Sequence, residues 1–332
     1  MNSAFSNYPR VRQRRLRTRP SVRDLVRESR IGSEDLIHPL FVLEGEGPDQ
    51  PIPSMPGQYR LTIPTLLEWA GRAWDVGVRA LALFPRVDDR FKTEDGRFAW
   101  DDEGLVPQTL RALKSNFPDL LVITDLALDP YSSMGQDGVV IDGEIHNELT
   151  IEALVKQGLC HARAGADIVA PSDMMDGRVG VIRDQLDEHG FTDTLIMAYS
   201  AKYASAFYGP FRDALDSAPR GGTDKRTYQM DPGNGDEALQ EVSLDLAEGA
   251  DIVMVKPGMP YLDLVWRVKE RFQRPTAVYQ VSGEYAMFKA ASANGWIDER
   301  ETVMEALLGF KRAGADMILT YYATDVAGWL RE

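Results

Sequence analysis

Apolar residues in this chain fall into short continuous runs that alternate with longer amphipathic stretches. A short apolar run bounded by turn residues is typical of a strand buried on both faces. Such runs predict strands at residues 36–43, 80–85, 120–128, 167–172, 194–200, 251–256, 275–282 and 317–322. The stretches between them predict helices at residues 62–75, 103–116, 151–164, 179–189, 236–248, 262–272 and 284–313, the last broken near Gly295, and a final helix follows the eighth strand.

The joins from helix to strand repeat along the chain. They read Arg163-Ala-Gly-Ala-Asp167, Glu248-Gly-Ala-Asp251 and Arg312-Ala-Gly-Ala-Asp316, with Asp75-Val-Gly-Val78 as a weaker copy. Glycine suits the left-handed residue that ends a helix, and each predicted strand begins shortly after it. Short turns at one end and long loops at the other predict a (β/α)8 TIM barrel of the α/β class, with its chemistry on the long loops. A doubly wound open sheet is the alternative, although no Gly-x-Gly-x-x-Gly follows the first strand.

Composition narrows the class of protein. The 332 residues are 44% hydrophobic, which supplies a large core, and Cys160 is the single cysteine. One cysteine excludes an intramolecular disulfide and a multi-thiolate zinc site within the chain. No apolar run approaches the roughly 18 residues that cross a membrane, and no signal-peptide core is present, so we expect a soluble cytoplasmic protein. Four histidines lie on separate elements, at His38, His146, His161 and His189, and we expect His161 and its neighbour Cys160 to be packing residues in a helix.

Charge is unevenly distributed along the chain. The formal net charge is −14, yet residues 10–30 hold nine arginines against Asp24 and Glu28, a local net charge of +7. Because residues 1–9 carry no charged side chain, residues 31–332 carry −21. We therefore predict a basic N-terminal arm at residues 1–30 and a barrel catalytic domain at 31–332. The arm favours contact with an acidic neighbouring subunit over nucleic acid, because no aromatic residues are interleaved with its arginines.

A lysine ends the predicted sixth strand, in Asp251-Ile-Val-Met-Val-Lys256, and a Pro-Gly turn follows it at once. Lysine is almost never fully buried without a partner, and burial favours its neutral amine. The neutral amine is the form that attacks a carbonyl carbon to give a Schiff base. By itself the stretch indicates either such a nucleophile or a side chain that extends from the strand end to a surface carboxylate.

A second lysine, Lys202, follows the fifth strand in the almost uncharged stretch Met197-Ala-Tyr-Ser-Ala-Lys202. In a barrel both lysines would face one cavity, where repulsion between their charges joins burial in lowering both pKa values. The alternative is that Lys202 is an ordinary loop lysine. Other polar residues at predicted strand ends are Asp125, Ser172, Asp173, Ser200, Ser282 and Tyr321.

Two long loops add candidate binding groups. Arg212 and Lys225 follow Lys202 in a mixed aromatic and basic segment, and an arginine with a lysine suits a carboxylate. The alternative is a solvated basic loop. The loop after the third strand spaces Asp125, Asp129 and Asp137, which suits Mg²⁺ or another hard cation, or equally an acidic turn capped by its own side chains.

Five motifs then occur in order along the chain: Val169-Ala-Pro-Ser-Asp-Met-Met-Asp-Gly-Arg178, Met197-Ala-Tyr-Ser-Ala-Lys202, Tyr228-Gln-Met-Asp-Pro232, Met254-Val-Lys-Pro-Gly-Met-Pro-Tyr-Leu-Asp263 and Tyr279-Gln-Val-Ser-Gly-Glu-Tyr285. On these motifs the chain resembles the porphobilinogen synthase (5-aminolevulinate dehydratase) family, from about Pro39 onward. The resemblance implies a (β/α)8 lyase that condenses two 5-aminolevulinate molecules into porphobilinogen through Schiff bases. Two waters are lost, and the product serves tetrapyrrole (heme or chlorophyll) biosynthesis.

The resemblance also implies roles for single residues. It places the P-side Schiff base on Lys256 and the A-side Schiff base on Lys202, with Asp125 and Ser172 near the reacting amines. The A-side carboxylate falls on Arg212 and Lys225, with Arg226 as an adjacent alternative to Lys225, and the P-side carboxylate falls on Ser282 and Tyr321. An arm that wraps a neighbouring subunit is implied as well, in a homo-octamer or hexamer.

Metal use departs from the zinc-dependent members. Where they carry three cysteines, this chain has Ala127, Asp129 and Asp137, which excludes thiolate zinc. The resemblance then implies the aspartate-rich branch that is associated with magnesium or potassium, or an enzyme that needs no metal. Met134 stands where many members have a histidine or another polar residue, which argues against a filled active-site metal at Asp129 and Asp137. Glu241 matches the family's allosteric magnesium ligand, and its alternative is a solvated helix acid.

Two other functions remain open from the sequence alone. One is an aldolase-type barrel with a single Schiff-base lysine, Lys256, and Lys202 as an electrostatic helper. The other is a nucleic-acid binder that acts through the arginine-rich arm.

Overall fold

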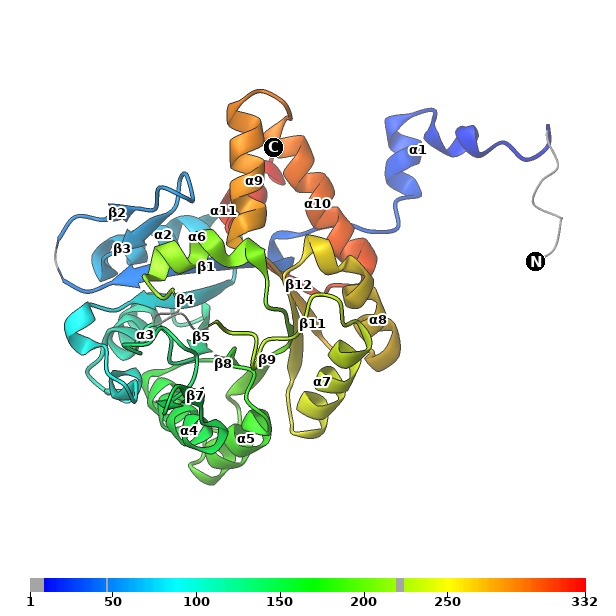
Figure 1. The fold of residues 1–332 in the computed structure, drawn as a ribbon. Coiled ribbons are helices and arrows are strands. Elements are labelled where there is room, and N and C mark those ends of the chain that lie inside the picture. The colour runs from blue at the N-terminus through cyan, green and yellow to red at the C-terminus, as the bar shows by residue number, and fades with distance from the viewer. Residues whose placement is uncertain (1–8, 46, 219–223) are drawn as a thin grey trace.

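Eight parallel strands close into a barrel in this computed structural model, which describes residues 9–45, 47–218 and 224–332 (Figure 1). Pairing of the last strand with the first closes the sheet, with Leu36 opposite Ile318. The predicted (β/α)8 fold is therefore confirmed and the open sheet is excluded. The barrel strands are β1 (Leu36–Leu43), β4 (Ala80–Arg86), β5 (Leu121–Leu126), β8 (Ile168–Pro171), β9 (Leu195–Lys202), β10 (Ile252–Lys256), β11 (Thr276–Gln280) and β12 (Met317–Thr320).

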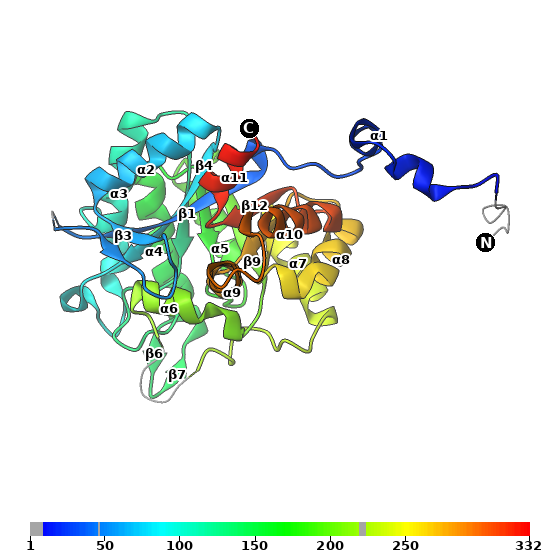
Figure 2. The same cartoon turned by 90° about the horizontal axis from the view of Figure 1, so that it is seen from above.

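Helices surround the barrel (Figures 1 and 2). They are α2 (Ile63–Val76), α3 (Leu105–Asn116), α4 (Asn147–Ala164), α5 (Arg178–Glu188), α7 (Asp236–Ala247), α8 (Leu262–Phe272), α9 (Ser282–Ala293), α10 (Glu299–Ala313) and α11 (Ala323–Trp329). The break predicted near Gly295 separates α9 from α10. Strands β8, β10 and β11 are buried at every position, which explains why their sequences are continuous apolar runs rather than alternating ones.

The sequence missed several short elements in segments predicted as loops. A hairpin of β2 (Gln50–Pro51) and β3 (Tyr59–Leu61) lies beside β1, and a second hairpin joins β6 (Val140–Ile141) to β7 (Glu144–Ile145). The long segment at 201–233 contains a 3₁₀ turn, η6 (Ala206–Tyr208), and a short helix, α6 (Gly209–Leu215). Elements of two to seven residues are too short to show a hydrophobic period, so tertiary contacts define them.

The repeated helix-to-strand joins form one structural device at the base of the barrel. Gly165, Gly249 and Gly314 take φ values of 104°, 103° and 106°, the left-handed conformation that glycine adopts without strain. The aspartate that follows each glycine accepts the backbone N–H of the preceding barrel strand, at 2.7–2.8 Å: Asp167 from Val122, Asp251 from Ile196, and Asp316 from Thr276. These contacts fix the register of neighbouring strands at the end opposite the long loops.

The N-terminal arm extends away from the barrel in both views (Figures 1 and 2). Its described part contains η2 (Gln13–Arg17) and α1 (Pro20–Leu25), and neither buries a residue. Residues 1–8 of the predicted arm lie outside the described residues. Within the ranges that the structure describes, no helix has both the length and the apolar character to cross a membrane.

Candidate active site at the barrel mouth

Lys202 and Lys256 end the neighbouring strands β9 and β10 and are direct register partners. Both are buried, at 5% and 6% exposure, and both line one small cavity at the carboxyl ends of the strands. The cavity encloses about 30 Å³, which leaves room for only about two waters. Its other lining residues are Asp125, Asp129, Asp137, Ser172, Tyr208, Phe211, Arg212, Ser217, Lys225, Gln229. The expectation that two lysines share one cavity is therefore correct.

Aromatic rings surround the amine of Lys256. Its Nζ lies 4.7 Å from the ring centre of Tyr279, 4.9 Å from that of Tyr199, and 5.1 Å from those of Tyr208 and Phe211. Burial, followed by the positive charge of Lys202, lowers the pKa of Lys256 to about 7, although nearby carboxylates act in the opposite direction. No carboxylate of the described residues forms an ion pair with this amine. Lys256 therefore has the neutral, nucleophilic form available near neutral pH.

Lys202 has a charged environment instead. Its Nζ donates to a carboxylate oxygen of Asp137 at 3.1 Å and to the backbone oxygen of Ser172. The other oxygen of Asp137 accepts from Lys225 at 2.5 Å, and Lys225 also reaches Asp129 at 3.2 Å. Burial opposes ionisation of Asp137, but the charges of Lys202 and Lys225 outweigh it and lower its pKa to about 2. Two lysines and two aspartates thus form a buried ion-pair chain.

Asp125 differs from the other two aspartates of its loop. Burial raises its pKa to about 7, against the opposing effect of the Lys202 and Lys256 charges. Its Oδ1 has no hydrogen-bond partner among the described residues. Ser172 lines the same cavity and favours the ionised form of this carboxyl group, so both polar residues lie in the cavity of the two lysines. A carboxyl group that gains and loses its proton near neutral pH suits proton transfer to a neighbouring amine.

Other predicted strand-end residues lie outside the cavity. Tyr321 contacts Tyr279, with 2.9 Å between the hydroxyl oxygens, so it lies one ring away from Lys256. Asp173 faces the buried Arg178 instead, at 3.5 Å. Ser200 donates to the backbone oxygen of Ala198 within its own strand.

The segment that contains η6 and α6 covers the mouth. The Tyr208 hydroxyl donates to the backbone oxygen of Lys256 at 3.2 Å, and the Phe211 N–H donates to Ser282 Oγ at 2.9 Å. Arg212 from this segment and Lys225 from the next loop both reach the cavity, as expected. Arg226 is exposed outside it and pairs with Asp224 at 3.7 Å. Of the two alternatives for the second carboxylate contact, the structure brings Lys225 into the cavity.

Sequence reasoning missed the uncharged lining of the site. Tyr199 and Tyr279 occupy strand positions that the apolar pattern counted as core, and Tyr208 and Phe211 lie in a segment from which only the arginine was assigned a role. Gln229 is buried beside the lysines, and its Oε1 has no partner among the described residues. The available signal was the high density of aromatic residues just after Lys202 in the sequence.

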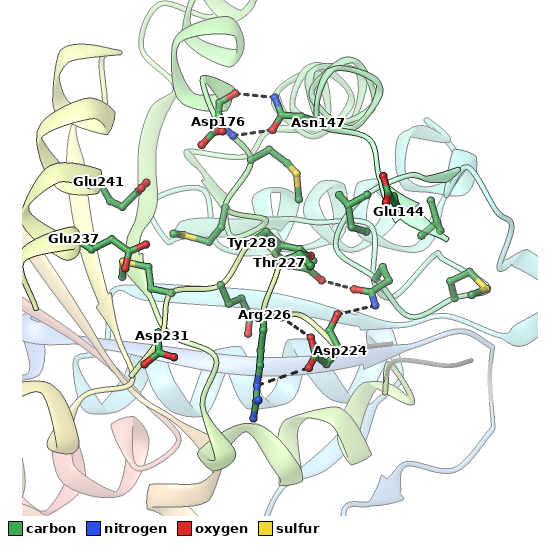
Figure 3. A pocket seen from close by; sticks show the side chains of 18 of the residues that line it. Glu144, Asn147, Asp176, Asp224, Arg226, Thr227, Tyr228, Asp231, Glu237 and Glu241 are labelled. Carbon is green, nitrogen blue, oxygen red and sulfur yellow. Dashed lines mark hydrogen bonds and ion pairs between the residues drawn. The ribbon is translucent and has the colours of Figure 1, made fainter. Parts of the chain in front are cut away.

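A larger cleft of about 790 Å³ opens beside the mouth and is acidic (Figure 3). Glu237 and Glu241 point into it from α7, and Asp176 lies near them, bonded to Asn147. Burial raises the pKa of Glu241. The positive charge of Arg178 opposes this effect, and the neighbouring carboxylates add to it, so the pKa stays above its usual value. Across residues 9–45, 47–218 and 224–332, no three His, Cys, Asp or Glu side chains are grouped to hold a metal ion.

Comparison with known proteins gives a consistent result. Residues 10–329 match the profile of the family described as delta-aminolevulinic acid dehydratase. A delta-aminolevulinic acid dehydratase of Bradyrhizobium diazoefficiens is 54% identical over 97% of this chain and 91% of its own, and one of Synechococcus elongatus is 52% identical over 97% and 99%. The crystal structure of delta-aminolevulinic acid dehydratase (porphobilinogen synthase) from Toxoplasma gondii, in complex with the reaction product porphobilinogen, superposes with a TM-score of 0.95. It is 55% identical and covers 96% of this chain and 91% of that chain.

Proposed function

Since this chain belongs to the delta-aminolevulinic acid dehydratase family, we propose that Lys256 and Lys202 each form a Schiff base with one of its two substrate molecules. The enzyme is a porphobilinogen synthase, a hydro-lyase of tetrapyrrole biosynthesis. It condenses two molecules of 5-aminolevulinate into one of porphobilinogen and releases two waters. The observation that carries the assignment of the lysines is their pairing: two buried amines are register partners on adjacent strands and line one cavity.

Different surroundings give the two lysines an order of reaction. Lys256 has no carboxylate partner, and its pKa of about 7 leaves a large neutral fraction, so it reacts first. Lys202 is ion-paired with Asp137 at 3.1 Å and becomes a nucleophile only after it gives up that contact. A cavity of about 30 Å³ is too small for either substrate, so we expect binding to move side chains that line it, those of the ion pairs or of the covering segment.

The carboxylate groups of the two substrates can replace contacts that protein groups make in the free enzyme. On the A side, Arg212 and Lys225 offer a guanidinium and an ammonium group, and a carboxylate bound by Lys225 replaces Asp137 there. On the P side, Ser282 and Tyr321 offer hydroxyl groups. Ser282 Oγ accepts the Phe211 N–H, and its hydroxyl donates to the backbone oxygen of Phe207 at 3.4 Å, so a P-side carboxylate competes with the covering segment for the hydroxyl proton.

Both imines serve the bond-forming steps. Each lysine amine attacks the ketone carbon of its substrate, and one water leaves as each C=N bond forms. A protonated imine withdraws electrons, which eases proton loss from the adjacent carbon to give an enamine. The enamine carbon attacks the other substrate's former carbonyl carbon, and a substrate amine then closes the C–N bond of the ring. Both lysines leave as free amines, and a final proton loss gives the pyrrole. Asp125 is placed to exchange the protons.

Reductive trapping tests the assignment of the two lysines. Borohydride is added to enzyme and 5-aminolevulinate, and the modified peptides are mapped. We expect substrate carbon on both the Lys256 and the Lys202 peptides. Carbon on Lys256 alone, even at saturation, would refute the two-imine mechanism and favour an aldolase-type site with one imine. Salt-sensitive binding of nucleic acid through residues 1–30, without any turnover, would refute the enzyme assignment itself.

A magnesium site is proposed at Glu241 rather than at the lysines. Mg²⁺ keeps several waters and takes one or two carboxylates, which fits the half-buried Glu241 in an acidic cleft with Asp176 and Glu237 nearby. Asp129 and Asp137 do not fit, because lysine ammonium groups already neutralise them. The expected result is that Mg²⁺ raises the melting temperature of the wild type and not of Glu241→Gln. Porphobilinogen formation with chelator and with added Mg²⁺ shows whether the ion is required.

The remaining assignments concern assembly and location. We infer that the arginine-rich arm binds a neighbouring subunit, because the arm is exposed and basic while the body of the chain is acidic. Deletion of residues 1–30 is expected to reduce the oligomeric mass in light scattering. We infer a cytoplasmic location from the single buried, unpaired Cys160, which suits a reducing compartment.

A further inference from the structure

Glu284 is a buried carboxylate that holds two separate loops at the barrel mouth. It is 1% exposed and stands on the third residue of α9. Its Oε2 accepts the backbone N–H of Val281 at 2.6 Å and that of Gly258 at 3.3 Å, and its Oε1 accepts the N–H of Met259 at 2.6 Å. Three backbone donors from two loops therefore converge on one side chain.

Helix capping explains only one of these three contacts. A glutamate at the third helical position commonly reaches back to the N–H of the cap residue, here Val281. The other two donors, Gly258 and Met259, belong to the loop that follows Lys256 and Pro257. Burial raises the pKa of Glu284 to about 7, although all three N–H groups favour the charged form. A buried acid that costs the fold free energy at this position invites a functional explanation.

The two loops that Glu284 joins carry the P side of the proposed site. Lys256 lies two residues before Gly258, and Ser282 follows Val281 directly. The loop at Gly258 is tightly packed, since a Cβ placed there would lie 2.8 Å from the Phe310 ring. The backbone oxygen of Lys256 is held as well, since it accepts hydrogen bonds from the Tyr203 N–H and the Tyr208 hydroxyl. Glu284 thus adds to the restraint of the backbone that directly follows the lysine.

We propose that Glu284 is a positioning residue that sets the distance between the Lys256 amine and the P-side carboxylate contact at Ser282. This proposal rests on the proposed function, in which Lys256 forms the P-side imine. Glu284 touches neither substrate nor amine, and it acts through the backbone of the two loops. Glu284→Gln keeps the shape but turns an NH₂ group toward backbone donors, so one side of the junction loses its acceptor.

The experiment compares imine formation at the two lysines in one sample. The probe is 4-oxopentanoate, the substrate without its amino group, which forms an imine but cannot complete the condensation. Borohydride trapping and peptide mapping then give a rate for Lys256 and another for Lys202. In Glu284→Gln we expect the Lys256 rate to fall about ten- to a hundred-fold, since misplacement by about 1 Å costs that much, and the Lys202 rate to change less than about two-fold. In Glu284→Asp, whose side chain is one methylene shorter, the Lys256 rate should lie between those of the wild type and Glu284→Gln.

Asp298→Asn is the matched control. Asp298 caps the start of α10 and does not line the cavity of the two lysines, and its carboxylate also accepts a backbone N–H, that of Glu301 at 2.8 Å. The control should keep both trapping rates near the wild-type values. If the Glu284 variants lost trapping rate equally at Lys256 and Lys202, or kept both rates at the wild-type values, the proposal would be overturned. Failure of the wild type to trap the probe on Lys256 would instead refute the proposed function.

Discussion

The two halves of the barrel mouth present their lysines in opposite ways. On one half, Lys256 is surrounded by the rings of Tyr199, Tyr208, Phe211 and Tyr279 and has no ion-pair partner among the described residues. On the other half, Lys202 is the first member of an ion-pair chain that continues through Asp137, Lys225 and Asp129. Two identical side chains on neighbouring strands thus have different surroundings, aromatic rings around one amine and a carboxylate beside the other.

The contrast suits a condensation of two identical molecules. If both amines were neutral at once, either would accept the first substrate and the two binding modes would compete. In the proposed mechanism, the aromatic setting keeps Lys256 reactive in the free enzyme, and the ion pair withholds Lys202 until a substrate carboxylate binds Lys225 and disrupts the ion-pair chain. The difference between the two halves would then distinguish two otherwise equivalent substrates.

Removal of the lysine from the aromatic half should have the largest effect. Lys256→Ala is expected to lower porphobilinogen formation by about 10⁴-fold or more, as loss of a covalent nucleophile does in other enzymes. Lys202→Ala should also abolish turnover, but 4-oxopentanoate should still be trapped on Lys256, at a rate that reflects the raised pKa of that amine. Lys156→Ala, at an exposed position on α4, is the control and should retain activity. A Lys256→Ala enzyme with a tenth of the wild-type rate would show that the amine is not essential.

Substitutions of the aspartates at the barrel mouth should change the free energy of unfolding. Asp137→Asn removes the shared partner of two buried lysines, so we expect the free energy of unfolding to fall by about 3–5 kcal/mol. Asp125→Asn should do the reverse. Its raised pKa means that the ionised form costs stability as pH rises from about 4 to about 7, so the asparagine variant should be more stable than wild type at pH 8 and not at pH 4.

Urea unfolding at pH 4 and pH 8 measures both differences. Loss of stability in Asp125→Asn at pH 8, comparable to that in Asp137→Asn, would contradict the distinction between a paired and an unpaired aspartate.

The pH dependence of imine formation tests the charge state of Lys256 directly. Since only the neutral amine attacks, the trapping rate should rise with pH through about 7 and level off above it. Lys202→Met removes a positive neighbour, which should raise the pKa of Lys256 and move the profile to higher pH. A rate that keeps rising to pH 10, as for an ordinary lysine, would show that burial does not lower this pKa.

Much of the fold follows from local sequence. Each barrel strand is an apolar run, and each glycine-aspartate join forms a helix end and a strand contact within a few residues, as at Gly165 and Asp167. Lys202 and Lys256 were predictable because each comes at a strand end, and parallel strands in a barrel end at one face.

The environments of the two lysines were not predictable in the same way. Asp137 was a plausible metal ligand by its spacing, and only the folded loops bring it between Lys202 and Lys225. The prediction that both amines share one kind of environment treated the lysines as equivalent, because the sequence does not show which one gains a carboxylate. Glu284 was visible only as part of a motif, since its bonds to Gly258 and Met259 join segments 25–26 residues apart.

The smallest expected effect concerns a single ring beside Lys256. Phe211→Leu keeps an apolar side chain and the backbone N–H to Ser282, but it removes a ring whose centre lies 5.1 Å from Nζ. An aromatic face stabilises a cation by about 0.5–1 kcal/mol, so the fraction of Lys256 held as protonated imine should fall about two- to five-fold, without change at Lys202. Phe98→Leu is the control, because Phe98 packs on Phe91 in a separate cluster. Equal losses at both lysines would mean that the ring orders the covering segment and does not stabilise charge.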